Sequence, residues 1–185
     1  EVTTVQRSFD DTRKLLVSFP DHATVETVLI PAVSGPGKTN PAEEDADAAT
    51  ADLDEDDEAP SVRRVTQCIS TQVGCAMGCV FCASGVAGLK RHLGAHEIVA
   101  QVLAGRSLLD EGEQLRNVVL MGMGEPLHNY ENTARTLRLL SHPAGINLSS
   151  RRVTVSTSGL VPEIDRLGAD FGGQVTLAIS LHATT

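Results

Sequence analysis

The sequence predicts an α/β fold: part of a βα barrel or doubly wound sheet, with a β-hairpin in front of it. Beyond residue 61, four strand-like runs alternate with helix-like segments, which is the pattern of βαβ units and a parallel sheet. Before residue 34, two strand-like runs flank a turn that contains proline, which is typical of a hairpin. Four parallel strands begin such a sheet without finishing it, and ligands bind at the carboxyl ends of the strands in either architecture.

The hairpin region, residues 1–33, contains the runs Lys14–Phe19 and Val25–Ile30, joined by Pro20–His22. Alternation along the second run places Glu26 on the face opposite Val25. A carboxylate on a strand is most often solvated, so the pattern by itself gives Glu26 no special role.

Residues 34–61 are predicted to be a disordered acidic insertion. The stretch Glu43–Glu58 holds ten acidic residues, and the whole segment has almost no large apolar side chain. Such a segment cannot bury enough surface to offset its ordering entropy. It also accounts for the formal net charge of −9, because the other 14 acidic residues nearly balance the 15 basic ones. Net charge therefore neither supports nor excludes an RNA substrate.

The core region, residues 62–185, contains the alternating elements. The strand-like runs are Val65–Val73, Asn117–Met123, Arg152–Ser158 and Gln174–His182. The helix-like segments are Ala95–Glu111, Glu131–Ser141 and Val161–Leu167. The chain lacks an initial Met and stops directly after a strand-like run, so we expect a fragment of a longer protein. Clustered cysteines without a signal sequence or long apolar span favour a cytoplasmic metal protein, expected to be a monomer without membrane contact.

Three of the four cysteines, Cys75, Cys79 and Cys82, lie within eight residues in the spacing C-x3-C-x2-C, with Phe81 before the last. Three thiolates on one short loop can converge on a single inorganic centre, and thiolates suit iron-sulfur chemistry. A set of three cysteines leaves one iron of a four-iron cluster without a protein ligand. In a 4Fe-4S cluster, that open iron can chelate the amino and carboxylate groups of S-adenosylmethionine, and the spacing resembles the signature of radical S-adenosylmethionine enzymes.

A structural zinc site is the alternative for these cysteines. Such a site needs four closed ligands, and the nearest candidates for the fourth are His92 and His96.

A polar or glycine-bearing motif follows each of the four core strands. The cysteine loop follows the first, Gly122–Pro126 the second, Ser156–Gly159 closes the third, and Ser180–His182 closes the fourth. Because these strand ends share one mouth, together they would form an adenosyl pocket. Glycines there allow close backbone approach to a ligand.

Four basic residues near these motifs are candidate phosphate contacts, and they could equally be ordinary surface bases. They are Lys90, Arg91, Arg151 and Arg152.

The chain resembles the RlmN family in four segments: Gln72–Cys75, Val119–Leu127, Arg151–Gly159 and Ala178–Ala183. That family comprises radical S-adenosylmethionine methyltransferases that methylate C2 of an adenine in 23S rRNA and, in some members, in tRNA. The resemblance runs from about Thr12 to the end of the chain, apart from the acidic insertion.

The resemblance implies residue roles. Cys75, Cys79 and Cys82 would ligate the 4Fe-4S cluster. The S-adenosylmethionine site would be lined by Gly124, Glu125, Ser156, Ser180, Leu181 and His182. Glu26 would be the proton acceptor, and Cys68 would help to release the product, where the sequence alone suggests a buried free thiol.

The resemblance also implies a mechanism. A methyl group placed on a cysteine near the C-terminus loses hydrogen to an adenosyl radical and adds to adenine C2, which is electrophilic and carries an unactivated hydrogen. The protein-RNA adduct breaks when C2 loses its proton and a disulfide forms, which the resemblance assigns to Cys68 and the methyl-carrying cysteine. All four cysteines of the chain lie before residue 83, so this fragment is expected not to complete turnover. A flavodoxin or ferredoxin would supply electrons.

Two other functions compete. A Cfr-like enzyme would methylate C8 of adenine, but Pro126 and Ser158 resemble the C2 enzymes more closely. A zinc-binding RNA-interaction module would leave Gly124, Glu125 and Ser180 at the strand ends unexplained.

Overall fold

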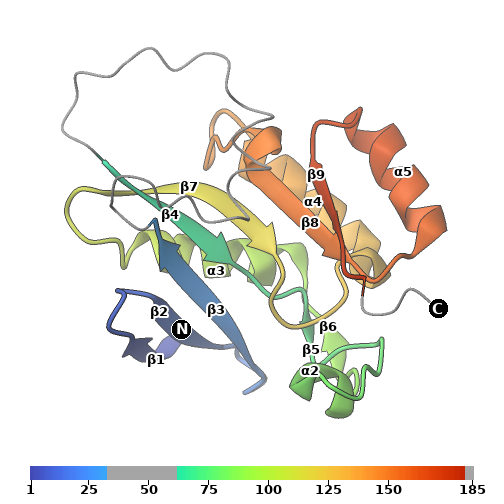
Figure 1. Ribbon diagram of the computed structural model, residues 1–185, viewed down its shortest axis with the longest axis horizontal. Coiled ribbons are helices and arrows are strands. Elements are labelled where there is room, and N and C mark those ends of the chain that lie inside the picture. The colour runs from blue at the N-terminus through green and yellow to red at the C-terminus, as the bar shows by residue number, and fades with distance from the viewer. Residues whose placement is uncertain (33–61, 182–185) are drawn as a thin grey trace.

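A computed structural model describes residues 1–32 and 62–181, which form a strongly curved mixed sheet with helices along its outer side (Figure 1). The acidic insertion predicted at 34–61 and the predicted site residue His182 lie outside the described residues. No helix among the described residues is long and apolar enough to cross a membrane.

The sheet contains seven strands in the order β1-β2-β3-β4-β7-β8-β9. Their bounds are β1 Val2–Arg7, β2 Arg13–Ser18, β3 Thr24–Pro31, β4 Arg63–Cys68, β7 Glu113–Leu120, β8 Val153–Thr157 and β9 Thr176–Ile179. The strands β1 to β4 pair antiparallel, whereas β4, β7, β8 and β9 pair parallel. The predicted parallel core and the hairpin before it are therefore confirmed, and both belong to the same sheet.

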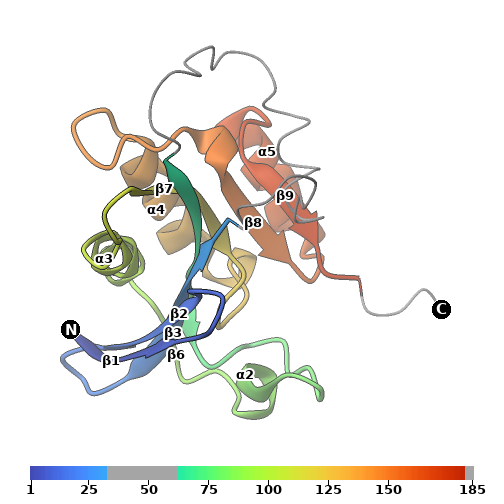
Figure 2. The same ribbon diagram turned by 60° about the vertical axis from the view of Figure 1, so that its left-hand side comes forward.

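Helices and short elements connect these strands. The helices are α2 Ala83–Val86, α3 Ala95–Arg106, α4 Tyr130–Ser141 and α5 Val161–Phe171, with 3-10 turns at Leu127–Asn129 and Ser150–Arg152. A second, two-stranded sheet pairs β5 Gln72–Val73 with β6 Arg91–His92. Figure 2 shows α3, α4 and α5 on the same side of the curved sheet.

The main hydrophobic core lies between the sheet and these three helices. Alternate residues of the strands, such as Val118 and Val155, are buried against Ile98 of α3 and Leu137 of α4. In α4 the buried residues recur at helical spacing, which explains why this segment forms an amphipathic helix. The intervening strand residues face the opposite, less buried side of the sheet.

Several sequence predictions need correction. The helix predicted at Ala95–Glu111 ends at Arg106, and the strand predicted at Asn117–Met123 is Glu113–Leu120. The strand β1 was not predicted, because this edge strand is largely exposed and lacks a regular apolar alternation. The predicted run Val65–Val73 is two strands, since the chain leaves the main sheet after Cys68 and Gln72 begins the pairing with β6. The helix predicted at Val161–Leu167 continues to Phe171, where Gly172 ends it at a φ of 58°.

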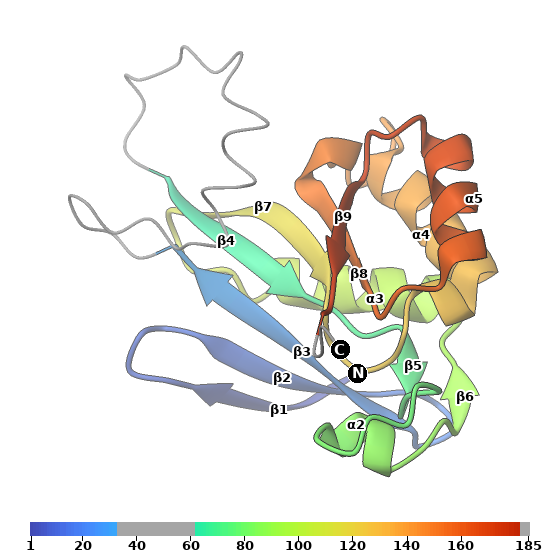
Figure 3. The ribbon, with the colours of Figure 1, turned by 45° about the vertical axis from the view of Figure 1, so that its right-hand side comes forward.

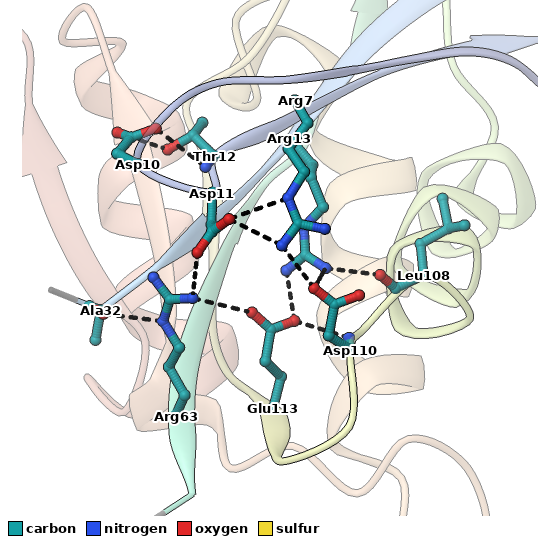
Figure 4. Close-up of polar contacts among 10 residues, drawn as sticks. All are labelled: Arg7, Asp10, Asp11, Thr12, Arg13, Ala32, Arg63, Leu108, Asp110 and Glu113. Carbon is teal, nitrogen blue, oxygen red and sulfur yellow. Dashed lines mark hydrogen bonds and ion pairs between the residues drawn. The ribbon is translucent and has the colours of Figure 1, made fainter. Parts of the chain in front are cut away.

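An ionic network fixes the β1–β2 turn to the amino ends of β4 and β7 (Figure 4). The Arg13 side chain is only 4% exposed; it pairs with Glu113 and donates to the Leu108 carbonyl at 2.8 Å. Asp11 accepts from Arg7 and from Arg63, each at 2.8 Å. Hydrogen bonds from Arg63 and Arg7 lower the pKa of Asp11. Removing one partner of a buried ion pair is costly, so this network anchors the N-terminal strands.

The contact between α3 and β4 depends on a glycine. Gln67 of β4 is fully buried, and its amide donates to Thr27 Oγ1 at 3.0 Å and to the Gln101 carbonyl at 2.7 Å. A Cβ atom on Gly105 would lie 2.4 Å from Gln67 Oε1. The helix can approach the strand this closely only because position 105 has no side chain.

We expect Gly105→Ala to lower the free energy of unfolding by about 1–3 kcal/mol, because overpacking this contact outweighs the better helix propensity of alanine. The matched control is Gly168→Ala in α5, where a Cβ atom would meet nothing within 4 Å. In the control, the free energy of unfolding should rise by about 0.5–1 kcal/mol. Urea denaturation of both variants measures the two values, and equal effects would contradict this packing.

Candidate functional site

The cysteine loop, residues 74–90, is closed at its neck by β5 and β6. Gln72 pairs with His92, and Val73 pairs with Arg91. Inside the neck, the Cys75 amide donates to the Gly88 carbonyl at 3.3 Å. Gly74 has a φ of +77°, and a Cβ atom there would lie 1.8 Å from the Gly88 oxygen, so the two limbs can meet only at a glycine. Figure 3 shows α2 and the β5–β6 pair beyond the ends to which β4 and β7 point.

All four cysteines are free and partly buried. Burial raises the pKa of the Cys75 thiol, the Met77 amide opposes this effect, and the charges of Cys79, Cys82 and Glu125 add to it. Among residues 1–32 and 62–181, no three His, Cys, Asp or Glu side chains are arranged to hold a metal ion. The three thiols thus lie on one loop and influence one another without converging on a common point.

The chemistry of the donor set fits an iron-sulfur cluster. Three unpaired thiols come from a single loop, and thiolates are the usual cluster ligands. The zinc alternative needs a fourth protein ligand. Of its two candidates, His92 has its Nδ1 atom 3.1 Å from the Gln72 amide nitrogen, so this ring atom already has a partner within the protein.

Gln72 joins the cysteine loop to the end of β7. Its side chain is fully buried, and its amide oxygen accepts from the Ala76 amide at 3.3 Å and from the Glu125 amide at 3.0 Å. Its amide nitrogen lies within 3.3 Å of Nδ1 of both His92 and His128. No local sequence signal predicts this role, because nothing near Gln72 in the sequence distinguishes a buried glutamine from a surface one.

Glu125 joins the end of β7 to the end of β8. Its side chain is buried: one carboxylate oxygen accepts from the Leu127 amide at 3.1 Å, and the other accepts from the Ser158 amide at 2.8 Å. Gly124 before it has a φ of +101°, and a Cβ atom there would lie 2.5 Å from Gln72 Cβ. The predicted glycine at this strand end is therefore required by close packing against Gln72.

The serines of β8 and β9 also meet. The hydroxyl oxygens of Ser156 and Ser180 are 3.0 Å apart. The Ser158 hydroxyl donates to Met77 Sδ at 3.1 Å, which connects the third strand end to the cysteine loop. Leu181, which follows Ser180, is 71% exposed. All the predicted strand-end residues that the structure describes thus lie at one end of the sheet.

Glu26 and Cys68 lie on the open face of the sheet. Cys68, the last residue of β4, pairs with Val28 of β3 on one side and with Val119 of β7 on the other. Alternation therefore places Glu26 and Cys68 on the same face, away from the helices. Burial raises the pKa of the Cys68 thiol, and a hydrogen bond from the Met121 amide opposes it.

The carboxylate of Glu26 and its backbone carbonyl have different partners. Its carboxylate is half-exposed and pairs with Lys14 at 2.9 Å. Its carbonyl accepts from the Ser70 hydroxyl at 2.6 Å, and the same hydroxyl accepts from the Met123 amide at 2.8 Å. Ser70 thus connects the strand of Glu26 to the loop after β7.

Arg91, one of the four candidate phosphate contacts, binds carboxylates of the protein itself. The Arg91 guanidinium lies between Asp21 and Glu97 and forms ion pairs with both. The sequence could not distinguish this clamp from a surface base, because its partners come from two other elements.

Comparison with known proteins identifies the relatives of the chain. The Radical SAM superfamily matches residues 69–185. A dual-specificity RNA methyltransferase RlmN from Sorangium cellulosum is 74% identical over 187 residues, covering 97% of this chain and 47% of that protein. A probable enzyme of the same name from Alkaliphilus metalliredigens is 56% identical over 118 residues, covering 64% of this chain and 33% of that protein.

The fold has a solved counterpart. The crystal structure of a radical SAM methyltransferase from Sphaerobacter thermophilus superposes with a TM-score of 0.78 at 43% identity, covering 99% of this chain and 46% of that one. The chain thus spans about half the length of these full-length relatives. Together with the arrangement of the cysteine loop and the strand ends, these matches establish that the chain belongs to the radical SAM superfamily and, within it, to the RlmN family.

Proposed function

We propose that this chain is part of a radical S-adenosylmethionine methyltransferase that methylates C2 of an adenine in 23S rRNA, and in tRNA as well. The observation that carries the proposal is the linkage of the cysteine loop to two strand ends through Gln72, Glu125 and Ser158. The name of the relatives, dual-specificity RNA methyltransferase, supports RNA as the substrate. We propose further that the full-length protein is a cytoplasmic monomer and that a flavodoxin or ferredoxin reduces it.

In this proposal Cys75, Cys79 and Cys82 hold a 4Fe-4S cluster. With S-adenosylmethionine bound and an electron from the reducing partner, the cluster would supply a radical able to take hydrogen from the methyl group of the methyl-carrying cysteine. The contribution of the chain is to place the three thiols beside the strand ends and to hold the ligand there.

The strand ends would bind S-adenosylmethionine. Gly124 lets the backbone approach the ligand closely, and Glu125 is fixed by two backbone amides so that its remaining lone pairs can accept from the ligand ammonium. The paired hydroxyls of Ser156 and Ser180 can exchange hydrogen bonds with ribose or carboxylate oxygens. Leu181 and His182 complete the proposed set, by resemblance to the family.

The open face of the sheet would meet the adenine. Glu26 is half-exposed there and would take the proton from C2. Cys68 is on the same face, and its thiolate would attack the sulfur of the methyl-carrying cysteine to form the disulfide. The sulfur–carbon bond would break with its electron pair left on the carbon attached to C2, and that carbon would take up a proton to become the methyl group. The target base must leave its stack to reach this face.

The cysteine assignments can be tested by cluster content in the full-length protein. We expect Cys75→Ala, Cys79→Ala and Cys82→Ala each to lower bound iron after anaerobic reconstitution from about four atoms per chain to nearly none. Cys68→Ala is the matched control and should keep the wild-type iron and sulfide content. Stoichiometric zinc in the wild-type protein, lost on replacing His92 or His96, would contradict the proposal in favour of the zinc module.

The role of Glu26 can be tested separately. Glu26→Gln should lower the methylation rate at least about 100-fold, since a positioned base commonly contributes 10²–10⁴-fold, while iron content stays unchanged. The control is Glu131→Gln on α4, whose carboxylate is 66% exposed and pairs with Arg166 of α5 on the helical side of the sheet, opposite the face that carries Glu26. Single-turnover methyl transfer measures the rate, and a Glu26→Gln rate within twofold of wild type would exclude Glu26 as the base.

A further inference from the structure

Arg91 occupies the point where three elements meet. It lies in β6 and pairs with Val73 at the neck of the cysteine loop. Its guanidinium donates to both carboxylate oxygens of Asp21, at 2.7 and 3.0 Å, in the turn between β2 and β3. It donates as well to both carboxylate oxygens of Glu97, at 2.8 and 2.9 Å, in the first turn of α3.

These contacts use the full donor capacity of the side chain. The fifth hydrogen bond runs from Arg91 to the His92 carbonyl at 3.1 Å, and a guanidinium has five N–H groups. The guanidinium carbon lies 5.5 Å from the centre of the Phe19 ring. Lysine cannot reproduce two bidentate pairs, so this joint is specific to arginine.

Glu97 makes the joint part of the start of α3. Its side chain is largely buried, and one carboxylate oxygen also accepts from the Gly94 amide at 2.8 Å. Burial opposes its ionisation, but the hydrogen bonds from Arg91 and Gly94 outweigh burial and lower the pKa of Glu97. The pKa of Asp21 is lowered chiefly by its hydrogen bonds from Arg91.

The two limbs of the cysteine loop are held differently. Ala76 and Met77 fasten the first limb to the sheet through Gln72 and Ser158. The second limb carries α2, where Val86 is 71% exposed. This limb rejoins the fold at β6, where the Lys90 amide donates to the Val73 carbonyl at 2.9 Å next to Arg91. The neck therefore holds the end of this limb.

We propose that Arg91 is a positioning residue that fixes the cysteine loop relative to the hairpin bearing Glu26. The inference rests on the proposed function only in assigning a cluster to the loop; the joint itself is a property of the fold. Replacing Arg91 frees the neck, lets the second limb move, and weakens retention of the cluster.

The test compares Arg91→Gln with Arg138→Gln in the full-length protein. Arg138 is a matched control, because it also pairs with an aspartate, Asp170, and stacks on an aromatic ring, but on the exposed surface of α4. The first readout is amide hydrogen exchange without cluster. The neck amides of Lys90 and Leu93, bonded to the Val73 and Thr71 carbonyls, should exchange at least about tenfold faster in Arg91→Gln alone.

The second readout is the rate at which a chelator removes iron from the reconstituted protein, expected to rise at least about fivefold in Arg91→Gln, with Arg91→Lys intermediate. Neck amides exchanging at the wild-type rate would overturn the proposal, and so would equal acceleration throughout the chain, which indicates a general loss of stability. If even the wild-type protein binds no cluster, the proposed function fails, while the exchange experiment still decides the role of Arg91.

Discussion

The site depends on the hydrogen bonds of the Gln72 side-chain amide, which is fully buried. The amide oxygen accepts hydrogen bonds from one backbone amide in the cysteine loop and from another in the loop after β7. The amide nitrogen lies against the rings of two histidines. A buried polar group left without partners is costly, so these contacts must form together. The requirement for glycine at position 124 follows, because any side chain there would collide with Gln72.

Packing is distributed unevenly around this group. On one side, three helices bury alternate strand residues in a continuous hydrophobic core. On the other, the cysteine loop presents exposed apolar side chains, with Val80 88% exposed. Sites that must admit a ligand are drawn from the less densely packed parts of a fold. Gln72 connects this loosely packed loop to the loop after β7, and Arg91 connects it to the β2–β3 turn and to the start of α3.

Local sequence patterns predicted the core strands and long helices because each buries one regularly spaced face. Edge strand β1 has no such face, and the break after Cys68 depends on a partner strand many residues later. The cysteine spacing and the strand-end glycines pointed to the site directly. The contacts that Gln72, Ser70 and Arg91 make could not be predicted, because their partners come from distant segments and a local sequence pattern carries no information about those partners. Glu26 required the family resemblance, since a half-exposed glutamate on a strand is ordinary.

The most direct measurement is electron paramagnetic resonance of the full-length protein, reconstituted anaerobically and reduced with dithionite, with and without S-adenosylmethionine. A reduced 4Fe-4S signal that shifts when the ligand is added is the predicted result, because a cluster held by only three cysteines would leave one iron open to the ligand. A colourless protein that holds zinc and gives no such signal would contradict the assignment of the cysteine loop as a cluster site.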